Sequence, residues 1–273
     1  MTSAVTRIGI TAAYVAIVLL FMLAGRAASN LLFRSRKVHH SPNLAMSVRH
    51  GGLYLAVAIA MTAALQGTTG GFVADVFEVL RDGGVIVFAL IVAQKINDWC
   101  IVPGLDNDQA VADGNTAVAL TEFGSYLGTG MIASASFGEG DGSWLTAIAF
   151  FAIGQAALIA GFWAQERLLP RSFLGAVRRG HAGAGIAVAG VMIALGVILR
   201  ASVAGPFLGW AASLRSLGIY AIGGILFLLA FQEVFTFAFA NRRYIEDPGH
   251  DMARSCVAAC GQIGLALVIT ALF

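Results

Sequence analysis

Charged side chains are scarce in this chain. Asp, Glu, Lys and Arg make up 12% of its 273 residues, whereas 58% of the residues are hydrophobic. Soluble domains usually carry about 25% charged residues, so this composition excludes a globule that water could solvate. The composition predicts an integral membrane protein in contact with the lipid bilayer.

Cysteine is also scarce, and the motifs of common enzyme and cofactor sites are missing. The three cysteines, Cys100, Cys256 and Cys260, give no disulfide framework. There is no GxxxxGK[ST] phosphate loop, no HExxH and no CxxC pair, and no Ser or Cys stands in a recognisable nucleophile setting. We therefore expect no catalytic residue, no metal site and no cofactor, and we do not expect an enzyme.

The basic residues are few but unevenly distributed. The net charge of +2 gives no argument for nucleic acid. Most Lys and Arg residues lie in the loops after the first, third, fifth and seventh apolar segments, as Arg34, Arg36 and Lys37 do. The positive-inside rule makes these loops cytoplasmic and puts both termini outside. Arg outnumbers Lys by 15 to 2, and together with the richness in Ala and Gly this ratio suggests a GC-rich genome and a bacterial source, so we expect the membrane to be a bacterial one.

Long uncharged runs are what the sequence has in abundance. A membrane helix needs roughly 17–25 apolar residues, and an eighth, shorter run reaches that length over Val76–Asn97 if its charges sit at the headgroup level. The fold class is therefore predicted to be all-α, a polytopic transmembrane bundle of about eight helices. The seven longer runs are Ile8–Gly25, Gly51–Ala74, Phe123–Gly138, Gly142–Gln165, Ala182–Leu199, Ser216–Gln232 and Ser255–Phe273.

The segments repeat beyond their shared hydropathy. Setting Ala45 against Ala117 aligns two stretches without a gap and brings Tyr54 onto Tyr126. A third unit joins if Ala176 takes the same place, and a fourth joins more loosely. We predict four two-helix repeats in two membrane halves, residues 1–137 and 138–273, with the even-numbered helices inside and the bulkier odd-numbered helices facing lipid.

Small and capping residues recur at matching places of the even-numbered helices. Asn and Asp suit helix N-caps because their side-chain oxygens accept backbone N–H groups, and small residues let helices approach closely in a membrane. The predicted caps that open the repeats are Asn43, Asn115 and Asp251, and the predicted helix-packing glycines are Gly52, Gly124, Gly128 and Gly183.

Two stretches carry a resemblance to a known family. NTAVALTEFGSYLGTGMIASA and HDMARSCVAACGQIGLALVITAL resemble the tandem repeat of the YjfL-like bacterial membrane proteins, domain of unknown function 350. Asn43 and Asn115 match the Asn that opens that repeat, whereas Asp251 replaces it. The resemblance implies an inner-membrane protein that works beside soluble partners, and it implies no activity or substrate.

Three ionisable residues share one place in this alignment: His50, Glu122 and His181. Each is predicted to lie about seven residues, or roughly 10 Å, inside its helix. Ionisable groups within membranes commonly mark ion or proton pathways, so the three could form a polar cluster that passes a proton or binds a cation. Alternatively, they lie on a solvated cytoplasmic rim, where Glu122 pairs with a neighbouring Arg.

Two function classes follow from these patterns. The first is a small channel or proton-linked transporter lined by the three ionisable residues. The second is a non-catalytic scaffold or partner subunit whose cytoplasmic loops dock soluble proteins, and either could form a homo-oligomer. A third class, an intramembrane enzyme, lacks any supporting motif.

Overall fold

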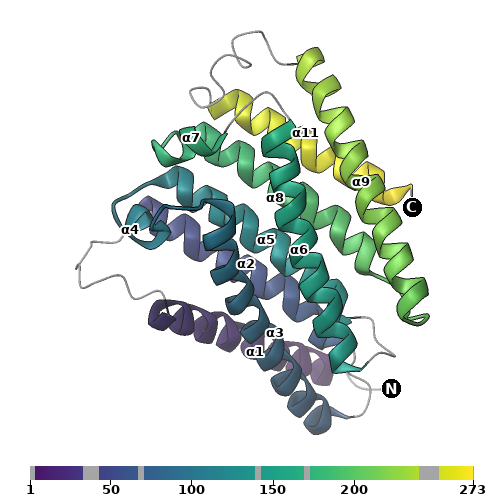
Figure 1. Ribbon diagram of the computed structural model, residues 1–273. Helices are drawn as coiled ribbons and strands as arrows, with labels where there is room; N and C mark the ends of the chain where they lie inside the picture. Colours follow the sequence, from purple (N-terminus) through teal and green to yellow (C-terminus); the bar gives the residue numbers. More distant parts are fainter. Residues whose placement is uncertain are drawn as a thin grey trace.

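The protein is a bundle of helices (Figure 1). The computed structural model describes residues 4–32, 43–66, 71–138, 143–168, 173–239 and 252–272, and within them every regular element is a helix, so the predicted all-helical class is confirmed. Two of the helices, α4 and α7, have six residues each. The helices of these ranges are α1 (Ala4–Leu32), α2 (Leu44–Gln66), α3 (Phe72–Ile101), α4 (Asn107–Ala112), α5 (Thr116–Gly138), α6 (Trp144–Leu168), α7 (Phe173–Arg178), α8 (Ala182–Val203), α9 (Trp210–Phe239) and α11 (Met252–Ala271).

Six of these helices are long and apolar enough to cross a membrane: α1, α2, α6, α8, α9 and α11. The chain is therefore a polytopic membrane protein. The helices α3 and α5 are 30 and 23 residues long, but α3 carries charges at both ends and α5 carries Glu122 and several hydroxyl groups. Both are long enough to cross a membrane, as the predicted count of eight spans requires, but they are not among the six helices that are also apolar enough.

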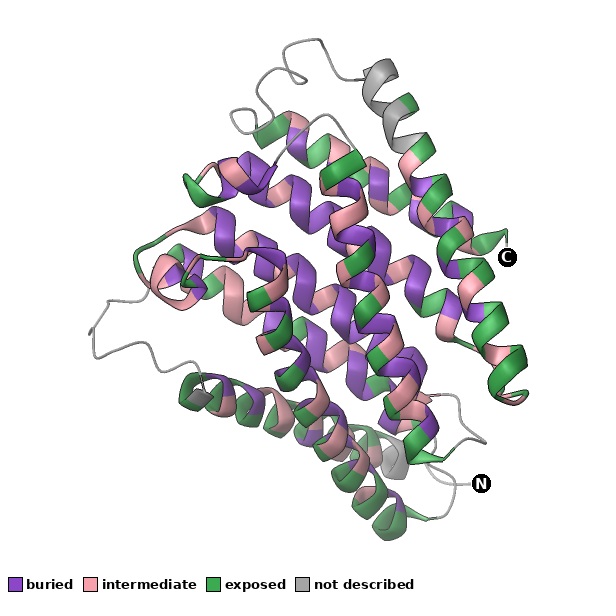
Figure 2. Cartoon of the chain, in the orientation of Figure 1, coloured by how far each residue is buried: buried purple, intermediate pink, exposed green. Residues whose placement is uncertain are grey.

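An inner row of helices forms the centre of the bundle. The order of this row is α2, α5, α8 and α11, each packing against the next, and α1, α3, α6 and α9 flank it. Buried residues concentrate in α5 and α8, whereas α1 and α9 are largely exposed (Figure 2). The apolar window of α8 is 78% buried against 11% for that of α1. The small residues of the inner helices explain this arrangement, since they allow backbones to approach closely.

Glycines at matching places make close contacts along the inner row. A Cβ atom added at Gly52 in α2 would lie 2.8 Å from Cα of Phe123 in α5, and one added at Gly190 in α8 would lie 2.6 Å from Cα of Ala259 in α11. Gly124 meets the backbone of Ala189 in the same way. Three successive interfaces therefore use a glycine at the same depth. Gly128, whose added Cβ would lie 2.7 Å from the carbonyl oxygen of Met192, makes a second contact between α5 and α8.

The third unit follows a different alignment from the predicted one. The short helices α4 and α7 end alike: Asn115 N–H donates to the Ala110 carbonyl at 2.9 Å, and His181 N–H donates to the Ala176 carbonyl at 3.0 Å. The preceding glycines, Gly114 and Gly180, both have positive φ, at 91° and 84°. His181 is thus the counterpart of Asn115.

This correspondence corrects two predictions. His181 stands at the N-cap of α8 and not two turns inside it, so the residue of α8 at the place of Glu122 is Val188. Gly183, which is buried in the first turn of α8, is likewise not the counterpart of Gly124, since Gly190 takes that place. The predicted alignment of the third unit with the second was therefore displaced by seven residues.

Candidate polar site between α2 and α5

Two of the predicted caps hold the ends of the inner helices. Asn43 accepts a hydrogen bond from Met46 N–H at 2.8 Å and donates its amide to the Ala112 carbonyl at 2.9 Å. Asn115 accepts from Val118 N–H at 3.1 Å and donates to the Val177 carbonyl at 3.3 Å. Each Asn therefore caps its own helix and ties it to the end of the short helix before the next inner helix. Asp251 lies outside the residues that the structure describes.

Replacing Asn115 with Ala is expected to lower the free energy of unfolding by about 1 kcal/mol, because the first turn of α5 loses its cap. Asn115→Asp keeps the accepting oxygen and loses only the amide donor, so it should lose less. Unfolding by SDS in mixed micelles measures both variants. If Asn115→Ala is as stable as the wild type, the cap does not hold α5.

Glu122 lies in a buried ion-pair cluster with Arg49. Its side chain is 3% exposed, and its Oε2 lies 3.0 Å from Arg49 Nε. The Nη2 atom of the same guanidinium lies 2.6 Å from Asp108 Oδ1, and its Nε also donates to the Tyr126 hydroxyl at 3.4 Å. Arg49 from α2 is therefore the centre of the cluster and joins α4 to α5.

Two further charged residues come from the last turns of α3. Lys95 Nζ lies 4.0 Å from Asp108 Oδ2. The carboxylate of Asp98 is hydrogen-bonded by the Asn107 side chain and is close enough to act electrostatically on Glu122. With Asp98, Asp108 and Glu122 against Arg49 and Lys95, these five side chains carry a formal charge of −1. We call these five residues and Tyr126 the polar cluster.

The helix packing does not need this cluster. A buried ion pair contributes little stability, because removing two charges from water offsets most of their attraction. In α8 the counterpart of Glu122 is Val188, which is 1% exposed, and the counterpart of Tyr126 is Met192, which is fully buried. At the same place, α8 therefore reaches close packing with apolar residues alone.

The two histidines do not join Glu122 in the contacts of the described residues. The His50 ring stacks on Tyr54 with centroids 6.5 Å apart, and its charged neighbours are Arg26 and Arg49. His181 caps α8. The predicted cluster of three thus corresponds to one buried carboxylate with an arginine partner, and the charged groups that act on Glu122 are Arg49, Lys95, Asp98 and Asp108.

A line of buried polar groups continues from the cluster along α5. The Asn97 amide donates to Ser125 Oγ and to Thr129 Oγ1, both at 3.0 Å, and Thr129 Oγ1 donates to Gln155 Oε1 at 3.1 Å. Positions 122, 125 and 129 follow the i, i+3, i+7 spacing of one helix face. The α5 path, as we name the face of Glu122, Ser125 and Thr129, therefore leads from the polar cluster into the bundle.

Ile132 interrupts this face one turn further on. Its side chain is fully buried, and a Cβ added at Gly154 in α6 would lie 2.5 Å from its Cγ2 atom. Beyond it, Ser136 lies on the same face at the far end of α5. The polar groups on the two sides of Ile132 are therefore separated by one apolar side chain.

The fold and this site define a polytopic α-helical membrane protein with a buried cluster of charged residues. The chain matches the model of the domain of unknown function 350 twice, over residues 3–137 and 141–273, and it belongs to this family. The two matches also confirm the predicted internal repeat.

The chain is also similar to a UPF0719 transmembrane protein of Aquifex aeolicus (strain VF5). It is 23% identical over 186 residues, which cover 66% of this chain and 67% of that protein. No solved structure matches the chain. The family and this relative agree with the membrane class, and neither description names an activity.

Proposed function

We propose that the protein is a permeation unit of the bacterial inner membrane, a channel or proton-linked transporter that moves protons or small cations along the α5 path. The observation that supports it is the buried Arg49–Glu122 pair at 3.0 Å, which continues into hydrogen-bonded hydroxyl and amide groups. Ionisable groups in such surroundings commonly serve ion or proton pathways. The proposal treats the chain as eight spans in four repeats, without catalytic activity.

Glu122 is the residue that would hold the ion or proton at the start of the path. Both oxygens of its carboxylate are buried without a hydrogen-bond partner, although Oε2 lies 3.0 Å from Arg49 Nε in the ion pair. Buried polar atoms normally have partners, so an acceptor left open beside a line of hydroxyls can take a proton or a cation. Ile132 then separates the α5 path from Ser136 at the far end of α5, and conduction across the bundle requires the Ile132 side chain to move.

Orientation follows from the positive-inside rule. The rule puts the ends of the inner helices that carry Asn43 and Asn115, and with them the polar cluster, on the cytoplasmic side. The competing hypothesis, a scaffold that docks soluble partners, depends mainly on segments that the sequence predicts to be cytoplasmic loops, such as residues 33–42 and 240–250. These loops lie outside the described residues, so docking and oligomer formation stay predictions.

Replacing Glu122 with Gln is expected to lower cation or proton flux at least tenfold, because Gln keeps the size of the side chain but cannot release a proton. The variant should fold, since Arg49 keeps Asp108 as its partner at 2.6 Å. Purified protein in liposomes with an internal pH dye, under an imposed potassium diffusion potential, measures proton flux. Sodium and potassium are tested in the same vesicles with ion-selective dyes.

The matched control is Asp106→Asn. Asp106 is an exposed cap of α4 that accepts from Gln109 N–H at 3.0 Å, so Asn removes the same charge and keeps a capping oxygen. Its flux should equal that of the wild type. A wild-type protein that moves none of the three ions would overturn the permeation proposal, and equal flux in Glu122→Gln would remove Glu122 from the path.

A further inference from the structure

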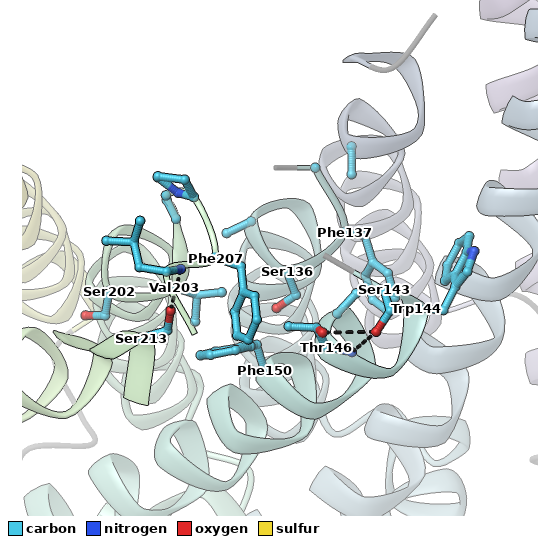
Figure 3. Close-up of a pocket in the computed structure, with 18 of the residues that line it drawn as sticks. Ser136, Phe137, Ser143, Trp144, Thr146, Phe150, Ser202, Val203, Phe207 and Ser213 are labelled. Atoms are coloured by element: carbon cyan, nitrogen blue, oxygen red, sulfur yellow. Dashed lines mark hydrogen bonds between the residues drawn. The ribbon is translucent and has the colours of Figure 1, made fainter. Parts of the chain in front are cut away.

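A second candidate site lies at the opposite end of α5. A cavity of about 420 Å³ opens where the last turns of α2, α5 and α8 meet the first turns of α3, α6 and α9 (Figure 3). It lies about 21 Å from the polar cluster along α5, at 1.5 Å per residue over the 14 residues from Glu122 to Ser136. Its volume is in the range of small-molecule sites, roughly 300–1,000 Å³.

The ionised side chains that line this cavity are both acidic. They are Glu78 and Asp82, one turn apart on α3. Arg81, which is not part of the lining, pairs with Asp82 at 2.7 Å and lies 5.9 Å from the ring centroid of Trp144. Even with Arg81 included, the formal charge at the cavity is negative, so the cavity attracts a cation and disfavours an anion.

Aromatic rings form two walls of the cavity. Phe137 and Trp144 lie on one side with centroids 6.1 Å apart, and Phe150 and Phe207 lie on the other with centroids 6.3 Å apart (Figure 3). Ring faces attract organic cations, and the position of Arg81 over Trp144 shows that this ring already holds one. An apolar group of a ligand can lie between the two walls.

A buried hydroxyl without a partner lies between these walls. Ser136 is 8% exposed, and its Oγ has no hydrogen-bond partner. Figure 3 shows its side chain on the Phe207 side of the cavity. Three other hydroxyls of the lining have partners: Ser143 and Thr146 bond each other at 3.1 Å, and Ser202 donates to the Ile198 carbonyl at 2.8 Å. Buried polar groups are normally paired. The open Ser136 hydroxyl therefore indicates that the cavity binds a ligand with a hydrogen-bond donor.

We propose that this cavity binds an organic ammonium group. A primary ammonium has three N–H donors, which suit the open Ser136 hydroxyl and the carboxylates of Glu78 and Asp82, and its alkyl part suits the aromatic walls. The ammonium belongs either to a free amine or to the headgroup of a lipid. This inference goes beyond the proposed permeation, and its test measures binding and not flux.

The probe is n-butylammonium, with 1-butanol as its uncharged counterpart. Binding to the full-length protein in nanodiscs is followed by the fluorescence of Trp144, with Trp144→Phe to show that the signal comes from the cavity. We expect n-butylammonium to bind at least tenfold more tightly than 1-butanol. Ser136→Ala and Glu78→Gln should each weaken it at least fivefold, and Asp106→Asn at the other end should not.

The composition of the nanodisc distinguishes the two sources. Binding is measured in two kinds of nanodisc. In one, half of the lipid is phosphatidylethanolamine and half is phosphatidylglycerol; in the other, an uncharged glycolipid replaces the phosphatidylethanolamine. Weaker binding of n-butylammonium in the presence of phosphatidylethanolamine assigns the site to a lipid headgroup. Equal binding in the two nanodiscs assigns it to a free amine. Both results support an ammonium site. Equal binding of n-butylammonium and 1-butanol, no binding, or binding unchanged by Ser136→Ala and Glu78→Gln would overturn it.

Discussion

Replacing Arg49 with Met is expected to lower the free energy of unfolding by about 3–5 kcal/mol. Removing one partner of a buried ion pair leaves the other charge uncompensated, and here one substitution leaves two carboxylates, Glu122 at 3.0 Å and Asp108 at 2.6 Å. The Arg49 side chain is only 13% exposed, so water replaces little of the lost interaction. Unfolding by SDS in mixed micelles gives the free energy.

Lys95→Met is the matched control, because it removes a second cation from the same cluster. Lys95 is 40% exposed and 4.0 Å from Asp108, and exposed pairs contribute about 0–1 kcal/mol. The double variant Arg49→Met with Glu122→Gln should be more stable than Arg49→Met alone, since it removes one uncompensated charge. Two results would show that Arg49 does not hold the cluster together. One is a double variant whose loss in the free energy of unfolding equals the sum of the two single losses. The other is a loss for Arg49→Met as small as that for Lys95→Met.

The inner row of helices was predictable because its cause is local. Lipid is as apolar as the helices, so no hydrophobic effect pulls membrane helices together, and close backbone approach decides which faces meet. Gly52, Gly124 and Gly128 mark the faces that can approach closely. The structure describes those faces as the α2–α5 and α5–α8 interfaces. The caps Asn43 and Asn115 were also predictable, since each bonds to N–H groups within its own first turn.

The position of His181 was not predictable from the same pattern. A shift of seven residues is close to two helical turns of 3.6 residues, so it keeps every side chain on nearly the same face. In a helix as rich in Ala and Gly as α8, both alignments match small residues to small residues. The hydrogen bonds after α4 and α7 decide between them, and a sequence shows those only once the short helices are recognised.

Arg49 was missed as a site residue because its partners are distant in the chain. As a basic residue near a helix start, it contributed to the positive-inside pattern, which says nothing of pairing. Its partners Asp108 and Glu122 lie 59 and 73 residues later. Glu122 alone could be singled out, since a carboxylate among small residues needs a partner, and the sequence offered an arginine or the two histidines.

The adjacent glycines of α2 should respond in opposite ways to the same substitution. Gly52→Ala is expected to lower the free energy of unfolding by about 1–3 kcal/mol, the usual range for an overfilled interior. Its Cβ would lie 2.8 Å from Cα of Phe123, and a backbone atom can retreat only if α2 and α5 separate. Gly51→Ala should instead stabilise the helix by up to about 1 kcal/mol, since its Cβ meets nothing within 4 Å.

Unfolding in mixed micelles compares the two variants directly, and equal stabilities would mean that α2 and α5 are not in close contact. The comparison also bears on the polar cluster, because Gly52 is one turn from Arg49 on α2 and Phe123 follows Glu122 on α5. Separating the helices at Gly52 must lengthen the 3.0 Å ion pair. Gly52→Ala should therefore alter the flux that depends on Glu122, whereas Gly51→Ala should leave it unchanged, and this difference links the packing of the inner row to the charged site that it holds.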